Sequence, residues 1–173
     1  MTLFRNQYRV DSARLKGWDY SRAGGYFITI CTDKRQSHFG HIADGQMRLS
    51  PIGDIVAAEW QRTAELRSHV ILDAWVVMPN HLHGIIVIQK DGVPQSVDGA
   101  GASSLKSGSV GAIIGQIKTV CKKRIKAMGV RTFDWQPRFH DHIIRDDADL
   151  ARIREYIVNN PAQWELDELY ADR

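Results

Sequence analysis

The chain has 173 residues, a net charge of +3, and 43% hydrophobic and 25% charged residues, which is the balance of an ordinary globular protein. No apolar run approaches the roughly 20 residues of a membrane span, so we expect no transmembrane helix. The first residues lack the apolar core of a signal peptide. Cys31 and Cys121 stand far apart with no CxxC spacing, which favours two packed thiols over a zinc site. We therefore predict a cytoplasmic protein with no membrane partner.

The length suits one domain with a single hydrophobic core, and we predict one catalytic domain over residues 1–173. Residues 1–24 are polar and basic without a clear period, and they predict an N-terminal arm. Residues 89–111 are rich in Gly, Ser, Asp and Pro. That composition predicts a flexible insertion within the domain.

In the first part of the chain, residues 26–32 are rich in aromatic and β-branched types and predict a strand. The turn signal Asp44-Gly45 precedes a short second strand at 46–49. Ser50-Pro51 is typical of a helix N-terminus, and we expect a helix from there to about residue 69.

The next two predicted strands, 71–78 and 82–88, are apolar almost throughout and predict central strands covered on both faces. After the insertion come a helix with an apolar stripe, a strand centred on 139–144, and a helix over 147–159. The stripe consists of Ile114, Ile117, Cys121 and Ile125. The order β-β-α-β-β-α-β-α predicts an α+β fold, in which helices pack on a mainly antiparallel sheet.

Two histidines, His81 and His83, lie one residue apart on a predicted strand. Because strand side chains alternate with a period of two, both imidazoles should project from one face while Leu82 points into apolar packing. Imidazole is a common metal ligand, so the pair predicts part of a metal site. An isolated pair of this kind is also compatible with ordinary strand histidines that neighbouring groups satisfy.

Tyr156 and Asn160 stand four residues apart and should share one face of the last helix. A half-buried aromatic residue and a helix terminator before Pro161 would explain both without any chemistry. As a nucleophile, a tyrosine needs help, because a phenol with a pKa near 10 is mostly protonated at neutral pH. A metal ion that polarises the electrophile would supply that help, and the Asn160 amide oxygen could be a further ligand.

Basic residues cluster on the helix after the insertion and continue beyond it. They are Lys118, Lys122, Lys123, Arg124 and Lys126 on the helix, followed by Arg138 and Arg145. A charge run is usually a solvated face, but here aromatic residues are interleaved with the basic ones beyond the helix. This pattern suits the binding of phosphates and unstacked bases, so we predict a DNA-binding surface.

From about residue 17 to 164 the chain resembles the HUH single-tyrosine transposases, and among them the REP-associated tyrosine transposases. The resemblance rests on five segments, of which the histidine and tyrosine segments are the most specific. They are residues 25–32, 77–84, 114–118, 135–136 with 141–145, and 156–161.

The resemblance implies a ferredoxin-like or RRM-like sheet, the HUH endonuclease fold, with the histidines on a central strand. It also implies that His81 and His83 hold Mg²⁺ or Mn²⁺, with Asn160 in a position where other members have Gln. Tyr156 would then attack a DNA phosphate and form a 5′-phosphotyrosine link. The implied partner is single-stranded DNA with a hairpin such as a REP element, bound by a monomer or a homodimer.

Two other readings of these residues stay open. The first is a non-catalytic nucleic-acid-binding module on the same fold. The second is a small metal hydrolase that uses the histidine pair. The hydrolase has the least support, because no Asp or Glu stands at a conventional third-ligand spacing from His81 and His83.

Overall fold

The computed structural model describes residues 15, 17–89 and 108–170. Within them the chain forms six strands, three α-helices and two 3-10 helices. In chain order these are β1 (Gly24–Cys31), η1 (Asp33–Arg35), β2 (Gly40–Ala43), β3 (Gln46–Leu49), α1 (Pro51–Glu65), β4 (Val70–Met78), β5 (His81–Ile88), α2 (Val110–Ala127), β6 (His140–Ile144), α3 (Asp147–Asn159) and η2 (Pro161–Leu166). Most of the predicted arm and of the predicted insertion lies outside the described residues.

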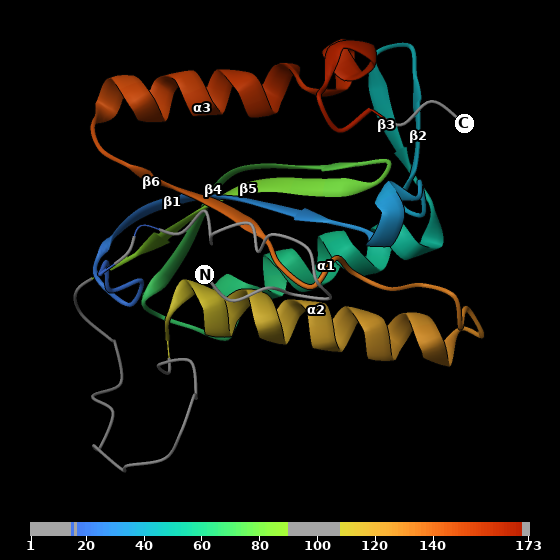
Figure 1. Ribbon diagram of the computed structural model, residues 1–173, viewed down its shortest axis with the longest axis horizontal. Coiled ribbons are helices and arrows are strands. Elements are labelled where there is room, and N and C mark those ends of the chain that lie inside the picture. Colours follow the sequence, from blue (N-terminus) through green and yellow to red (C-terminus); the bar gives the residue numbers. More distant parts are fainter. Residues whose placement is uncertain (1–14, 16, 90–107, 171–173) are drawn as a thin grey trace, which may run out of the picture.

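Four strands form one antiparallel sheet in the order β4-β5-β1-β6. Helices α1 and α2 cover one face of this sheet, and α3 lies across the other (Figure 1). The predicted α+β architecture is therefore confirmed. None of the described helices is both long and apolar enough to cross a bilayer.

The expectation that residues 71–78 form a central strand is wrong, because β4 is an edge strand. Its side chains are mostly half-buried, and Ile71 is 45% exposed. The pairing of β4 with β5 is also irregular between Leu72 and Trp75. A bulge and a short, uneven ladder are ways in which proteins keep an edge strand from pairing with other chains.

Strand β2 was not predicted, and it pairs with β3 in a separate two-stranded sheet. The turn between them contains Asp44 and Gly45, both with positive φ, as hairpin turns of two residues require. Helix α1 ends earlier than predicted, at Glu65, although its start is as expected because the Ser50 hydroxyl caps the Gly53 N–H at 3.1 Å. The bounds of the last helix, 147–159, are confirmed.

The main hydrophobic core fills the space between the sheet and helices α1 and α2. All four residues of the predicted stripe on α2 are buried there. The fully buried Trp60 of α1 lies against Gly84 of β5, where an added Cβ would stand 2.2 Å from the indole Cζ2. Gly84 is thus the residue that lets α1 approach the central strand closely.

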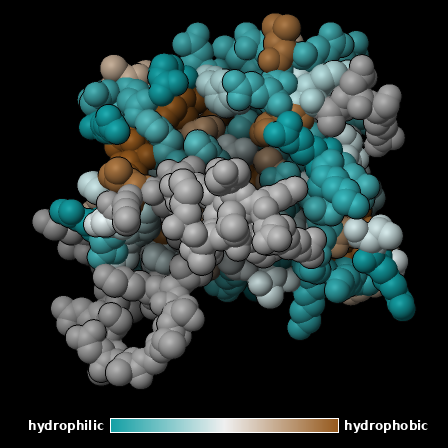
Figure 2. Space-filling view, in the orientation of Figure 1, coloured by the Kyte–Doolittle hydropathy of each residue, from teal (hydrophilic) through white to brown (hydrophobic). Residues whose placement is uncertain are grey.

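A smaller apolar cluster lies on the other face of the sheet, beneath α3. It joins Ile85 of β5 to Ile153 and Ile157 of α3, all buried. Figure 2 shows hydrophobic side chains at the surface between α3 and the sheet, on the left of that view. This small cluster fixes the height at which α3 lies above the strand that carries the histidines.

Candidate active site

The two histidines of β5 project from the face of the sheet that α3 covers, and Leu82 between them lies in the main core. Both are almost inaccessible to solvent, at 0% exposure for His81 and 2% for His83. Their ring centroids are 4.4 Å apart. The prediction of two imidazoles on one face with Leu82 on the other is confirmed.

A second set of residues orients the imidazole rings. His81 Nδ1 lies 2.7 Å from the Asn80 side-chain oxygen, which can only accept, so His81 donates through Nδ1 and keeps a lone pair on Nε2. The Asn80 orientation is fixed in turn, since its Nδ2 donates to the carbonyls of Arg35 and Leu169. His83 Nδ1 lies 2.8 Å from the hydroxyl of Thr29 on β1. Partners of this kind are typical of metal-binding histidines.

Both histidines are held neutral. Burial, with the neighbouring His83 and with Arg35, places the pKa of His81 well below its usual range. Burial also lowers the pKa of His83 to about 4, although the charge of Asp167 acts in the opposite direction. At neutral pH the two rings are therefore in the form that can coordinate a cation.

Helix α3 brings the Tyr156 hydroxyl to 3.1 Å from Nε2 of His83. The tyrosine ring also meets the Phe27 ring edge-on at a centroid distance of 6.1 Å. Tyr156 remains 42% exposed, so a substrate can reach its hydroxyl. The predicted nucleophile and the predicted metal-binding histidines thus meet within one chain.

Polar contacts fix α3 to both edges of the sheet. The Arg154 guanidinium makes two hydrogen bonds to the Asp73 carboxylate on β4, at 2.8 and 2.6 Å. On the opposite edge, His142 of β6 lies 2.7 Å from the Asp149 carboxylate in the first turn of α3. The helix is therefore held at two places, one on each side of the strand beneath Tyr156.

Asp167 completes the site, and the sequence analysis did not assign it. Its Oδ2 accepts hydrogen bonds from the Tyr156 hydroxyl at 3.2 Å and from Asn160 Nδ2 at 2.6 Å. Ligand atoms of His81, His83 and Asp167 all lie within 4.8 Å of one another. Asp167 reaches this position because η2 turns the chain back after α3. The spacing between Asp167 and the histidines in the sequence does not predict this turn.

The donor atoms of the site fit a divalent cation. Among the described residues, His81 Nε2 and Asn160 Oδ1 are buried side-chain atoms without a hydrogen-bond partner. Buried polar atoms are seldom left unpaired, and coordination of an ion is one of the common explanations. Two neutral imidazoles, an amide oxygen and a carboxylate form a mixed nitrogen and oxygen ligand set that suits such an ion.

The hydroxyl of Tyr156 is not a ready nucleophile on its own. Burial raises its pKa above the usual phenol value, and the negative charge of Asp167 raises it further. Ionisation at neutral pH therefore requires a positive charge near the hydroxyl, or a proton acceptor that acts as the phosphate is attacked.

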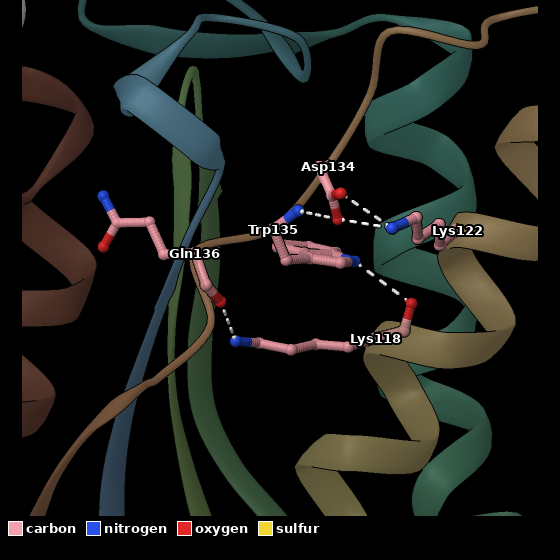
Figure 3. A network of polar contacts seen from close by, with 5 residues as sticks. All are labelled: Lys118, Lys122, Asp134, Trp135 and Gln136. Atoms are coloured by element: carbon pink, nitrogen blue, oxygen red, sulfur yellow. Dashed lines mark hydrogen bonds and ion pairs between the residues drawn. The ribbon is translucent and has the colours of Figure 1, made fainter. Parts of the chain in front are cut away.

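Helix α2, which carries five of the predicted basic residues, is on the opposite face of the sheet from α3 (Figure 1). Three of its residues make internal contacts. Lys118 donates to the carbonyls of Gln136 and Arg138 at 2.7 and 2.8 Å, Lys122 pairs with Asp134 at 2.7 Å, and Arg124 pairs with buried Glu59 at 2.5 Å. Figure 3 shows the contacts of the two lysines.

The other predicted DNA-binding residues are exposed. They are Lys123 and Lys126 on α2, Arg138 before β6, and Arg145 after it. The structure therefore brings together the predicted nucleophile and metal ligands, while it leaves the predicted DNA contacts spread over α2 and both ends of β6.

Comparison with known proteins gives relatives along most of the chain, although no protein-family model matches it. An uncharacterized protein of Haemophilus influenzae is 39% identical over 170 residues, which are 93% of each chain. A REP-associated tyrosine transposase of Escherichia coli is 25% identical and covers 83% of this chain and 70% of its own length. A solved REP-associated tyrosine transposase bound to a REP hairpin has the same fold, with a TM-score of 0.60, 22% identity, and coverage of 90% of this chain and 76% of that one.

The sheet carries paired histidines on a central strand beneath a helix with a tyrosine, and the named relatives of the chain support a transposase-type enzyme. The chain is a relative of the REP-associated tyrosine transposases of Escherichia coli and Haemophilus influenzae.

Proposed function

We propose that this protein cuts and rejoins single-stranded DNA beside a hairpin, with Tyr156 as the nucleophile. The observation that carries the proposal is the position of the Tyr156 hydroxyl, 3.1 Å from His83 and 3.2 Å from Asp167, above two buried neutral histidines. The names of the relatives support the same reaction class.

The proposed step is a transesterification. The Tyr156 oxygen forms a bond to the phosphorus, and the bond from phosphorus to the 3′ oxygen breaks, which leaves a 5′-phosphotyrosine and a free 3′-OH. The tyrosine proton passes to Oδ2 of Asp167, and the departing 3′ oxygen takes a proton from water. One phosphoester replaces another, so a 3′-OH can reverse the step without an external energy source.

In this proposal His81 and His83 hold the divalent ion, Mg²⁺ or Mn²⁺, together with Asn160 and Asp167. When bound, such an ion draws negative charge from a phosphoryl oxygen and so favours attack at phosphorus. The protein itself keeps both imidazoles neutral by burial. It also aims their Nε2 atoms through the bonds that Asn80 and Thr29 make at Nδ1.

The proposed substrate is a hairpin of the REP type, since a relative of the same fold was solved with a REP hairpin. One chain holds both the tyrosine and the histidines, so a monomer is sufficient for a single nick, and a homodimer would carry two such sites. We also propose that the whole chain, residues 1–173, acts as one catalytic domain.

The test is a denaturing gel of end-labelled hairpin DNA with a single-stranded flank, incubated with the protein and Mn²⁺ or Mg²⁺. We expect a covalent protein–DNA adduct that is lost in Tyr156→Phe and in chelator, while DNA binding stays within about two-fold of the wild type. The matched control is Tyr170→Phe, which should still form the adduct. An adduct in Tyr156→Phe would overturn the assignment of the nucleophile, and binding without any wild-type adduct would favour the non-catalytic binding module.

A further inference from the structure

We infer that single-stranded DNA runs from the active site over the β6 edge of the sheet and onto α2 on the opposite face, past Gly115. The inference rests on the proposed function for its choice of ligand. It also accounts for an arrangement that is otherwise puzzling, because the basic helix and the tyrosine lie on different faces of the sheet.

A groove of about 1270 Å³ joins these two regions. Its lining includes His83 and Tyr156 of the candidate active site as well as Gly115 and Lys118 of α2. Along its length the lining includes the apolar rings of Phe27 and Phe139 and the polar side chains of Arg138, His140 and Arg152. Aromatic rings beside basic side chains are the usual means of holding unpaired nucleotides.

The strand register extends the histidine site toward this groove. His83 of β5 is opposite Thr29 of β1, and Thr29 is opposite His140 of β6, so all three side chains share one face. Two strand spacings separate His140 from His83, or about 10 Å. His140 is exposed, so a phosphate next to the one at the active site can meet its imidazole.

Charge favours the β6 edge over the opposite edge. Asp73 is the single charged or titratable side chain of β4, and its carboxylate already binds Arg154. The β6 edge instead has Arg138 and His140 at its start and Arg145 at its end, and the one carboxylate of β6, Asp141, is buried. A polyanion leaving the site therefore meets positive groups on one side and a carboxylate on the other.

Gly115 gives an independent indication that the groove is kept open on α2. It lies in the interior of the helix and is exposed, and a Cβ built there meets no heavy atom of the described residues within 4 Å. Packing within the described structure therefore gives no reason for a glycine, which weakens a helix at such a position. A glycine is expected where another backbone approaches the helix closely.

The segment before β6 that lines the groove is fixed to α2 by hydrogen bonds. Lys118 donates to the carbonyl of Arg138. It also donates to the carbonyl of Gln136, and the Trp135 indole donates to the Lys118 carbonyl at 3.1 Å (Figure 3). The segment that leads into β6 is thus held against the helix. Both elements line the groove, so this part of its wall does not depend on a free loop.

The first test uses Gly115→Glu and Gly115→Lys, which add side chains of similar length and opposite charge. The probe is a labelled oligothymidylate of about 20 nucleotides, and its dissociation constant is measured by fluorescence anisotropy. We expect Gly115→Glu to weaken binding by about ten-fold relative to Gly115→Lys, with melting temperatures at or above that of the wild type in both. Equal affinities for the two variants and the wild type would overturn the inference.

The second test removes Arg138 and His140 together by substitution with Ala. Its matched control is His41→Ala with Arg48→Ala, an exposed histidine and arginine paired across the β2–β3 hairpin and outside the groove. The groove variant should bind the oligothymidylate at least about five-fold more weakly and with a salt slope smaller by about 0.7. Equal losses in the two double variants, or no loss in the groove variant, would contradict the path.

The two proposals can fail separately. A wild-type adduct that depends on Tyr156, together with unchanged binding by both sets of groove variants, would refute the path and leave the reaction standing. Weaker binding by the groove variants, together with no adduct from the wild type, would refute the reaction and leave the path standing.

Discussion

The carboxylate of Asp167 lies 3.2 Å from the hydroxyl of Tyr156 and accepts its hydrogen bond. This contact has two opposed effects on the tyrosine. The negative charge raises the pKa of the hydroxyl and so disfavours the phenolate, while the same oxygen is placed to receive the proton. A cation between Asp167 and the histidines would oppose the first effect, because its positive charge lowers the pKa of the hydroxyl.

We expect Asp167→Asn to raise the Mn²⁺ concentration needed for half-maximal adduct formation by about ten-fold or more, because it removes an anionic donor from the site. A manganese titration of adduct yield on a denaturing gel measures this. Glu165→Gln is the control, since Glu165 is an exposed carboxylate on the same segment. An unchanged manganese dependence in Asp167→Asn would exclude Asp167 as a ligand.

The buried histidines predict a loss of stability in mild acid. In the folded protein the pKa of His83 is about 4, whereas in the unfolded chain it is near 6.5. The unfolded state thus binds more protons across this window, and stability falls as the pH falls from about 6.5 toward 4. For His83 alone the loss at pH 5 is on the order of 2 kcal/mol.

Urea unfolding at pH 7.5 and pH 5, with a chelator present at both, measures this loss. His83→Gln should show a smaller difference between the two pH values than the wild type does, because glutamine does not titrate. His41→Gln is the control, since His41 is exposed. A wild-type stability that is the same at both pH values would contradict the prediction.

Glycines at two positions predict opposite changes in stability. Gly84→Ala should destabilise the protein by about 2 kcal/mol, because the new Cβ would stand 2.2 Å from the Trp60 indole. Gly115→Ala should stabilise it by up to about 1 kcal/mol, because its Cβ meets open space among the described residues and alanine favours the helix. Urea midpoints of the two variants provide the comparison, and a shift in the same direction for both would contradict it.

The basic residues of α2 should divide into two groups. Arg124→Ala removes the nearer of the two arginines that pair with Glu59, a residue only 5% exposed, and should cost about 1–2 kcal/mol of stability. Lys123→Ala and Lys126→Ala change exposed side chains and should alter stability by less than about 0.5 kcal/mol. If α2 binds DNA, the lysine variants should weaken hairpin binding by two-fold or more. Unfolding curves and binding isotherms of the same samples separate the two effects.

The parts of the fold that could be predicted are those with a strong local signal. The β5 histidines follow from alternation, the stripe on α2 from helical spacing, and the end of α3 from the proline after Asn160. Strand β2 was missed because its four residues include a glycine and a histidine and show no alternation. The edge position of β4 was missed because its composition is as apolar as that of a central strand.

The site was predictable where its residues come from regular elements. His81, His83, Tyr156 and Asn160 lie on a strand and at a helix end, so spacing places them on defined faces. Asp167 enters through the short helix η2, which has no periodic pattern of its own. The internal contacts of Lys118 and Arg124 could not be predicted either, because a cluster of charges in the sequence does not show which residues contact Gln136 or Glu59.

The short connection between β6 and α3 has a genetic consequence. Strand β6 ends at Ile144 and α3 begins at Asp147, and Asp73 and His142 then hold the helix over its own sheet. A helix tethered in this way serves the histidines of its own chain. A cell with two defective alleles, one that encodes Tyr156→Phe and one that encodes His81→Ala with His83→Ala, should therefore stay defective, because neither product can complete the other.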